Sequence, residues 1–587
     1  MDKKSSEISK RRKQWEESTV KGAVSRFSYI QNSPAQFYTP DALEDFDFLK
    51  KVGFPGEYPY TAGPYPFHPN AALKEFTGKS ETNRFQRGSS GQTRASEYSG
   101  YGAPESTRDY YKKMISIGSP GGPNLACDLP TQLGYDSDNP AISGEVGKVG
   151  VSIDTLRDFE VIYEPFEGKL NIDKIATAWT INAPANFFIA MYIALAKKRG
   201  IPLDKLRFTP QNDILKEYVA RGTYIFPPEK ALRLFRDSLV FTAKNIPHAN
   251  IVSGGGYHMR EAGATREQDL AYSMVNIATY CQIGIDAGLS IDEFAPQFTI
   301  NAFGGDMEFL KEIAFMRATR RMYATLMKER FGAKKPKSMI IRQQRGAHMG
   351  RCNTTVQRPL NNLSRSVVGA IAAGLSGGPA AAFPPFDEAL GLGWSLEARQ
   401  LSEDAQRILT VEAKIHEVVD PFAGSYYMES LTNEIEDNAW KEFDKVMSMG
   451  GVVAAIESGY IKREIGKSAY TRQKMIEEGE QYIVGVNCFT GEHELDVRVK
   501  TLVQHPYDAG EREKAEELQK KNLAEVKKKR HSKGVKKSLE ELKKTVKDVS
   551  ADTIPPLIIC AEEYATLQEV CDVFREVFGE YEDRAGL

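Results

Sequence analysis

The chain has few of the features that mark secreted, metal-bound or membrane-embedded proteins. Its 587 residues include six cysteines, scattered without a C-x-x-C pair or a cluster with histidine. That spacing argues against a zinc site and a disulfide framework. No apolar run is long enough to span a bilayer, and the charged N-terminus MDKKSSEISKRRKQWEES lacks the apolar core of a signal peptide. We therefore expect a soluble cytoplasmic protein with no membrane contact.

An excess of one charge is also missing, since 77 Lys and Arg residues are balanced by 79 Asp and Glu residues. Such a balance gives no general attraction to nucleic acid or to anionic lipid. The phosphate-binding pattern G-x-x-x-x-G-K-[ST] is absent, as are H-E-x-x-H and G-x-S-x-G. The sequence therefore lacks the common motifs of P-loop nucleotidases, zinc proteases and serine hydrolases.

The middle of the chain alternates short apolar segments with longer helical patterns, which indicates βα units around a parallel sheet. Eight such segments read as strands, and eight parallel strands close a barrel, so the predicted fold is an α/β protein with a (β/α)8 TIM barrel. The eight segments are NLACDL (124–129), IATAWTI (175–181), LRFTPQ (206–211), ANIVSGG (249–255), FAPQFTI (294–300), SMIIRQ (338–343), GPAAAF (378–383) and HEVVDPF (416–422).

Two regions flank the predicted barrel of residues 116–430. Residues 1–115 are rich in Pro, Gly and Tyr and read as an extended N-terminal arm with a helix near 8–24. Residues 431–587 read as a helical C-terminal extension, including the charged run EREKAEELQKKNLAEVKKKRHSKGVKKSLEELKKTVKDVS. A run of this kind is more often a solvated helical face than a nucleic-acid site. We expect it to pack on a partner or on the outside of the barrel.

The strand ends are the places to look for chemistry, because barrels of this type carry their catalytic groups there. His258 follows a Gly-rich strand end in GGGYHMREAGA (254–264). Glycines let a ligand approach the backbone, and an imidazole can donate a hydrogen bond to a carbonyl. A histidine that caps the next helix explains the same pattern, and the local sequence leaves both readings open.

A second cluster follows the third predicted strand. Gln211 ends that strand, and Arg221 lies where the helix after Asp213 breaks at Gly222. A guanidinium at this point can bind a substrate carboxylate through two hydrogen bonds. It can also pair with the last carbonyls of the helix, which is the interpretation that the local sequence favours.

Long strings along the chain resemble the large, substrate-binding subunit of adenosylcobalamin-dependent acyl-CoA mutases, the methylmalonyl-CoA mutase family. In order they are DALEDFDFLKKVGFPGEYPYTAGPYP, CDLPTQLGYDSDNPAISGEVGKVGVSIDTL, QNDILKEYVARGTYIFPPE, GYHMREAGA, RPLNNLSRS, FDEALGL, VDPFAGSYYME and YIVGVN. The resemblance implies a radical 1,2-rearrangement of an acyl-CoA carbon skeleton, with the CoA chain threaded along the barrel axis.

The resemblance also implies the cofactor adenosylcobalamin and a partner. Cobalamin domains of this family carry D-x-H-x-x-G, whose histidine ligates cobalt, and none of the eight histidines here lies in such a string. We therefore expect the cobalt ligand to come from a separate small cobalamin-binding subunit carrying D-x-H-x-x-G, and no metal ligand in this chain. A dimer of heterodimers is the expected assembly.

Residue roles carry over by matching position. Tyr98 and His258 are the expected catalytic residues: Tyr98 would lie between substrate and adenosyl group, and His258 would hydrogen-bond the thioester carbonyl. The expected substrate-binding residues are Arg221, which would bind a free carboxylate, and Gln211, Tyr257 and Tyr65. The expected cofactor contacts are Glu388 and Glu261.

Several departures from the family fall in the substrate channel. Gln297 and Asn301 stand where an arginine and an aromatic residue are usual, which suggests a bulkier substrate. Tyr98 and Arg221 favour a carboxylated acyl-CoA of the methylmalonyl or succinyl type. Ala126 replaces the aspartate of 2-hydroxyisobutyryl-CoA mutases, which disfavours a hydroxyacyl group. The alternative is a catalytically retired paralogue that only scaffolds an oligomer, and the retained polar residues argue against it.

Overall fold

A short parallel sheet lies at the centre of the chain. The computed structural model describes residues 3–22, 37–43, 46–67, 99–116, 121–300, 307–341, 353–377, 385–390, 396–491 and 509–583. The strands within them are β1 (Asn124–Ala126), β2 (Thr177–Thr180), β3 (Phe208–Pro210), β4 (Val252–Gly254) and β5 (Phe298–Ile300). They coincide with the first five predicted strands.

The five strands are parallel neighbours in chain order. Strand β2 pairs with β1 and β3, and β4 pairs with β5. The amides of Asn250 and Ser253 donate to the carbonyls of Phe208 and Gln211, at 2.8 and 2.9 Å, and so join β3 to β4. The chain is therefore an α/β protein in which successive strands end on one edge.

Helices follow the strands and carry the apolar spacing seen in the sequence. Those up to β5 are α5 (Pro104–Ser116), α6 (Leu129–Gln132), α7 (Leu156–Ile162), α8 (Ala185–Lys198), α9 (Ile214–Lys216), α10 (Pro228–Asn245), α11 (Tyr257–Glu261), α12 (Arg266–Asp286) and α13 (Ile291–Phe294). After β5 come α14 (Phe309–Thr325), α15 (Pro336–Met339), α16 (Asn361–Leu375) and α17 (Leu396–Arg407). Gly200, Gly288 and Gly332 follow α8, α12 and the turn after α14 with positive φ, as expected of helix C-termini.

Shorter helical turns complete the path. They are η1 (Glu16–Val20), η2 (Pro40–Leu43), η4 (Pro140–Ile142), η5 (Gly168–Leu170), η6 (Leu203–Lys205), η7 (Glu217–Arg221), η8 (Ala295–Gln297), η9 (Leu326–Arg330), η10 (Glu388–Leu390) and η11 (Ile408–Glu412).

Two of the last three predicted segments are not strands where the structure describes them. The described part of 338–343 begins inside α15, because Pro336 starts a helical turn and the Ser338 hydroxyl is held by Asp292 at 2.6 Å. The segment 416–422 forms turns, because Asp420 adopts a left-handed φ of 47° before a proline. Residues 378–383 lie outside the described part. The predicted closure into eight strands is therefore not observed within the described residues.

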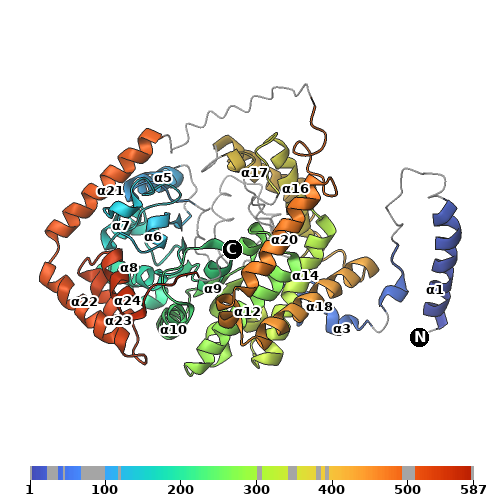
Figure 1. The fold of residues 1–587 in the computed structure, drawn as a ribbon, viewed down its shortest axis with the longest axis horizontal. Helices are drawn as coiled ribbons and strands as arrows, with labels where there is room; N and C mark the ends of the chain where they lie inside the picture. Colours follow the sequence, from blue (N-terminus) through green and yellow to red (C-terminus); the bar gives the residue numbers. More distant parts are fainter. Residues whose placement is uncertain are drawn as a thin grey trace.

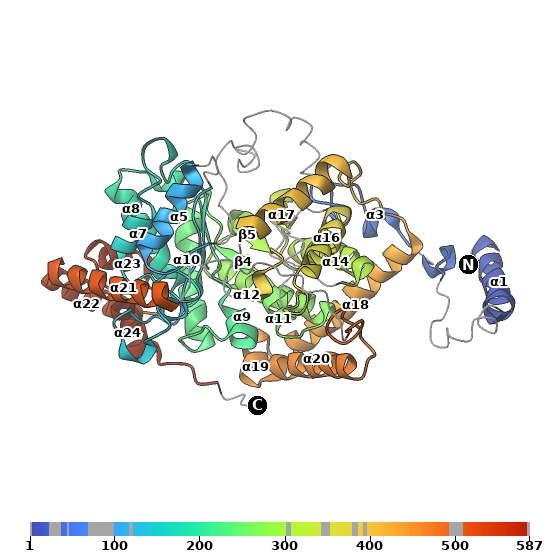
Figure 2. The same cartoon turned by 90° about the horizontal axis from the view of Figure 1, so that it is seen from above.

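Helix α1 of the N-terminal arm and the last four helices, α21–α24, lie at opposite sides of the molecule, whereas α18 packs against the arm. Helices α1 (Lys3–Trp15) and α3 (Phe48–Lys51) belong to the arm, and α1 extends away from the body (Figures 1 and 2). The later helices are α18 (Tyr426–Ser448), α19 (Val452–Glu457), α20 (Tyr460–Glu477), α21 (Ala509–Lys529), α22 (Ser532–Lys547), α23 (Ile554–Glu562) and α24 (Leu567–Phe578). None of the helices in the described ranges is long and apolar enough to cross a membrane.

Helices α21–α24 pack back onto the first βα units, beside α5, α7 and α8 (Figure 1). The charged run is helical, and α22 buries one stripe while its other side chains stay in solvent, as predicted for a solvated helical face. The buried stripe consists of Val535, Ser538, Leu542 and Val546.

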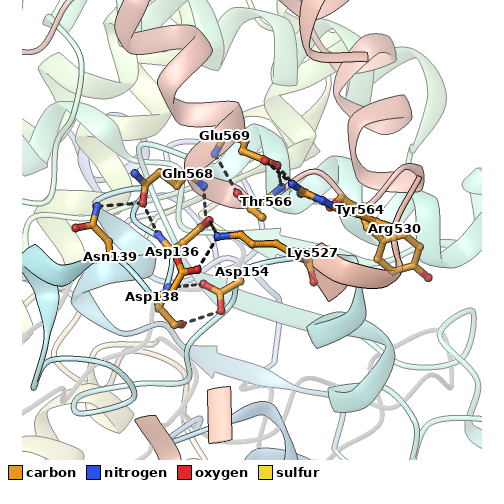
Figure 3. A network of polar contacts seen from close by, with 12 residues as sticks. Asp136, Asp138, Asn139, Asp154, Lys527, Arg530, Tyr564, Thr566, Gln568 and Glu569 are labelled. Atoms are coloured by element: carbon orange, nitrogen blue, oxygen red, sulfur yellow. Dashed lines mark hydrogen bonds and ion pairs between the residues drawn. The ribbon is translucent and has the colours of Figure 1, made fainter. Parts of the chain in front are cut away.

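A network of hydrogen bonds and ion pairs connects helices α21–α24 to the loop after β1 (Figure 3). Asp136 and Gln568 exchange two hydrogen bonds: each backbone amide donates to the other side chain, at 3.0 and 2.9 Å. Lys527 bridges Asp136 and Asp138, at 3.2 and 2.8 Å. Burial raises the pKa of Asp136 to about 6, although the Gln568 amide and Lys527 favour its ionised form. The extension thus packs on the outside of the α/β core, one of the two predicted locations.

Three buried arginines on α14 hold the arm and α18 in place. Arg317 donates to Asp420 at 2.8 Å and to both oxygens of Glu429, at 2.6 and 3.1 Å. Arg320 donates to the arm carbonyls of Tyr60 and Thr61, at 3.0 and 2.6 Å. The third, Arg321, pairs with Glu436 of α18 and also donates to an arm carbonyl.

The two fully buried guanidiniums differ in their partners. Burial alone would lower the pKa of Arg317, but Asp420 and Glu429 outweigh it and raise that pKa above its ordinary value. Arg320 faces neutral carbonyls, so burial lowers its pKa to about 9. Arg317 is therefore the charge whose loss would leave two carboxylates buried without a counter-charge.

Arg317→Met is expected to lower the free energy of unfolding by about 3–5 kcal/mol, because Asp420 and Glu429 would remain buried without a cation. Denaturant unfolding measures the change. Arg463→Met, at an exposed position of α20, is the matched control and should cost far less. Equal losses in both variants would contradict this role of Arg317.

Candidate active site

Polar side chains gather where three neighbouring strands end. Asn182 follows β2, Gln211 follows β3, and Tyr257 follows β4. The Asn182 Nδ2 donates to Gln211 Oε1 at 2.9 Å, which ties the first two ends together. The amide of Gly255 donates to Asp213 at 3.1 Å and ties β3 to β4. The ends of these three strands therefore meet at one edge of the sheet.

Gln211 and Arg221 are in direct contact. The helix after Asp213 runs through α9 and η7 and ends at Gly222, whose φ is 89°, as predicted. Arg221 Nη1 donates to Gln211 Oε1 at 3.4 Å and lies 3.5 Å from Glu217. About a quarter of the Arg221 side chain is exposed, at 23%. The guanidinium thus reaches the strand-end cluster while part of it remains accessible.

A buried ion pair supports this cluster. Lys216 and Glu217 are 1% and 0% exposed and form a direct ion pair. Burial would raise the pKa of Glu217, but Lys216 and Arg221 outweigh it and lower that pKa. Thr223 also donates to Glu217 through its backbone amide, at 3.1 Å. The carboxylate is therefore ionised and holds two cations at the end of β3.

Tyr257 and His258 open helix α11 side by side. Their ring centroids are 3.7 Å apart and both side chains are half-buried. The preceding glycines have a packing role that the sequence analysis did not predict. A Cβ on Gly256 would lie 1.5 Å from Asp269 Oδ1, and one on Gly254 would lie 3.0 Å from Ile277. Both glycines thus let α12 pack closely against the strand end.

Asp269 is an unusual group in this contact. It is 1% exposed, and the Ser273 hydroxyl donates to it at 3.2 Å. Burial raises the pKa of Asp269 to about 7, and the nearby Arg260 offsets only part of this rise. The carboxyl therefore titrates near neutral pH, next to the turn that carries Tyr257 and His258.

The two predicted cofactor contacts, Glu261 and Glu388, are near enough to interact electrostatically. Glu261 lies three residues after His258 on α11, so the two share one side of that helix. Although the Glu388 side chain reaches solvent, desolvation by the surrounding protein raises its pKa to about 7, with smaller contributions from the charges of Glu261 and Asp387. A carboxyl that titrates near neutrality can donate as well as accept hydrogen bonds, which suits a ligand that carries hydroxyl groups.

The remaining predicted residues lie in the arm. Tyr65 is half-buried just beyond Gly63, which packs against Gly377 and Val419. Tyr98 lies outside the described residues, one position before the bridge between Ser99 and Leu125 of β1. Asn301 also lies outside them.

Comparison with known proteins shows the family of this chain. The profile of the family described as methylmalonyl-CoA mutase matches residues 29–580. The chain belongs to this family. It is 34% identical over 588 residues to the 2-hydroxyisobutanoyl-CoA mutase large subunit of Aquincola tertiaricarbonis, a match that covers 98% of each chain.

Other members of the methylmalonyl-CoA mutase family are similar over most of this chain. The mitochondrial methylmalonyl-CoA mutase of Mus musculus is 35% identical over 90% of this chain and 66% of its own length. The methylmalonyl-CoA mutase of Rhizobium meliloti is 33% identical over 93% of this chain and 71% of its own length. This family member thus spans about two thirds of those longer chains and nearly all of the large subunit.

Sequence reasoning missed the supporting residues of this family member's site. Lys216, Glu217 and Asp269 touch the predicted site residues or their turn, yet they read as ordinary helix charges. The sequence contains one indication that these charges are buried: Lys216 and Glu217 directly follow the apolar residues Ile214 and Leu215. Buried charges in such a turn must be paired.

Gly256→Ala is expected to destabilise the protein by about 1–3 kcal/mol, because its Cβ would collide with Asp269 and force the turn away from α12. Thermal unfolding measures the loss. Gly466→Ala, in α20 with open space around the new Cβ, is the control and should be neutral or slightly stabilising. A neutral Gly256→Ala would rule out the close packing.

Asp269 predicts a pH dependence of stability. Its folded-state pKa of about 7 lies above the ordinary value of 3.8, so the folded state binds the extra proton. Its contribution is complete below about pH 4 and is lost as the pH rises through 7. The stability of the wild type relative to Asp269→Asn should therefore fall over that range. Denaturant midpoints at several pH values test this, with Asp286→Asn at the exposed end of α12 as control. A constant difference would refute it.

Proposed function

We propose that this chain is the substrate-binding subunit of an adenosylcobalamin-dependent mutase that rearranges the carbon skeleton of a carboxylated acyl-CoA. The observation that supports the proposal is the group of positively charged side chains at the end of β3. There Arg221 contacts Gln211 next to the strand end that bears Tyr257 and His258. A partly exposed guanidinium with a neighbouring amide is suited to bind a carboxylate.

Each of the other predicted site residues would have a role that suits its side chain. His258 would donate a hydrogen bond to the thioester carbonyl and stabilise charge that develops there. Tyr257 would pack against the acyl group, and its contact with the His258 ring would restrict the imidazole. Tyr98 and Tyr65 would close the pocket from the arm. Arg221 would hold the free carboxylate, so the acyl group is fixed at both ends.

A second, acidic corner fits the adenosyl part of the cofactor. Glu261 and Glu388 interact electrostatically, and Glu388 titrates near neutrality, so this pair can both accept from and donate to ribose hydroxyls. Adenosylcobalamin supplies, when bound, the radical that starts the rearrangement. The surrounding protein would exclude water from that step.

The proposed assembly is a complex of two kinds of chain. The match over 98% of a protein named as a large subunit supports a separate small cobalamin-binding subunit that carries D-x-H-x-x-G and the cobalt ligand. We also propose a dimer of heterodimers, a (β/α)8 barrel to which the five described strands belong, and an organisation into arm (1–115), barrel (116–430) and extension (431–587).

Two classes of substrate are alternatives for this site. Arg221 favours a carboxylated acyl group, including a bulkier substituted succinyl-CoA. The full-length match to a 2-hydroxyisobutanoyl-CoA mutase large subunit favours a hydroxyacyl group. Ala126 ends β1 and is buried, so this position offers no carboxylate to a substrate hydroxyl. The retired scaffold is not favoured, because it would have no need for a buried ion pair under an accessible arginine.

Anaerobic turnover tests the proposal. The chain, a cobalamin-binding subunit and adenosylcobalamin are mixed with methylmalonyl-CoA, alkylsuccinyl-CoA esters or 2-hydroxyisobutanoyl-CoA, and products are identified by mass spectrometry. Isomerisation of a carboxylated ester is expected. Isomerisation of the hydroxyacyl ester alone would overturn the substrate class, and an inactive but fully formed complex would support the scaffold.

His258→Ala in the same assay is expected to lower kcat by about 100-fold to 1000-fold while acyl-CoA binding changes little, because the lost hydrogen bond serves developing charge. His248→Ala, at an exposed position, is the matched control. Equal losses in kcat and in binding would show that His258 only holds the substrate.

A further inference from the structure

The amide of Gln211 has a fixed orientation. Its Oε1 accepts hydrogen bonds from Asn182 Nδ2 at 2.9 Å, Lys216 Nζ at 2.7 Å and Arg221 Nη1 at 3.4 Å. Lysine and arginine can only donate, so the atom that faces them must be the carbonyl oxygen. The NH2 group of Gln211 therefore points away from this cluster.

The donors are themselves fixed by their other contacts. Asn182 Oδ1 accepts from the Asp213 amide at 3.0 Å, which assigns its Nδ2 to the Gln211 side. The same Nδ2 also donates to Glu217 at 2.7 Å. Glu217 in turn pairs with Lys216 and accepts from Thr223. A rotation of the Gln211 amide would place its NH2 against these donors.

Lys216 cannot act by touching a ligand. Its side chain is 1% exposed and its ammonium group is shared between Glu217 and Gln211. Burial of both charges is costly unless each is paired, and here each is paired. An effect of Lys216 on a substrate must therefore pass through Gln211.

We propose that Lys216 is a positioning residue that locks Gln211 so that its NH2 group is presented as a hydrogen-bond donor to the acyl carboxylate, beside Arg221. The proposal rests on the proposed function and deepens it. A locked donor next to a guanidinium selects an acyl group with two acceptor oxygens at this point. Lys216 thus contributes to the choice of a carboxylated substrate without contacting it.

The first test changes only the outward atom of Gln211. In Gln211→Glu the inner oxygen still accepts from Lys216 and Asn182, so the thermal midpoint should be kept or raised, whereas the outer atom becomes an acceptor that repels a carboxylate. Titration calorimetry of the chain with succinyl-CoA and with free CoA should show about a tenfold or greater loss for succinyl-CoA alone. Binding of succinyl-CoA as in the wild type would overturn the orientation.

The second test asks whether Lys216 acts through Gln211. Lys216→Met should weaken succinyl-CoA binding about tenfold and leave CoA binding unchanged. In the Gln211→Met background the same change should have no further effect, since the amide is already lost. Additive losses would overturn the proposal. Lys198→Met, an exposed lysine paired with Glu160, is the matched control and should leave binding unchanged.

Two further measurements distinguish a failure of the proposed role of Lys216 from a failure of the proposed carboxylate site. If Lys216→Met does not fold, Asn182→Ala takes its place in the cycle, because Asn182 donates to the same Gln211 oxygen. Non-additivity with Gln211→Met then supports the lock, and additivity overturns it. A wild-type chain that binds succinyl-CoA no better than free CoA would overturn the carboxylate site of the proposed function itself.

Discussion

The buried guanidinium of Arg317 is the interaction on which the arrangement of α14, the turn at Asp420 and α18 depends. It lies on α14, directly after the last described strand, and binds Asp420 and Glu429 where the chain turns into α18. Its neighbour Arg320 holds the arm carbonyls near Tyr60. The arm, the late turns and α18 are therefore positioned by one short stretch of helix, and the edge of the sheet is framed by segments far apart in sequence.

The proposed site has a positively charged region and a negatively charged region. The end of β3 carries Lys216 and Arg221, held by the ionised Glu217, whereas Glu261 and Glu388 form an acidic corner on and near α11. This separation gives two binding surfaces of opposite character. In the proposed function, a carboxylated acyl group would bind at the first and the hydroxyl groups of the cofactor's adenosyl part at the second.

The sequence predicted those parts of the fold that depend on local pattern. Five strands and the long helices followed from apolar spacing and glycine ends. The segments at 338–343 and 416–422 have strand-like composition, but Pro336 and the left-handed Asp420 commit them to turns. Gln211 and Arg221 were predicted from strand position and family resemblance. The role of Lys216 was not, because it depends on which atom of Gln211 the folded chain leaves outward.

The most direct test of the account is electron paramagnetic resonance of the complex of this chain with a cobalamin-binding subunit and adenosylcobalamin, frozen anaerobically with and without a carboxylated acyl-CoA. The account predicts a paramagnetic signal of cobalt coupled to an organic radical that appears only when the acyl-CoA is present. Absence of that signal in a complex that demonstrably binds both cofactor and acyl-CoA would contradict it.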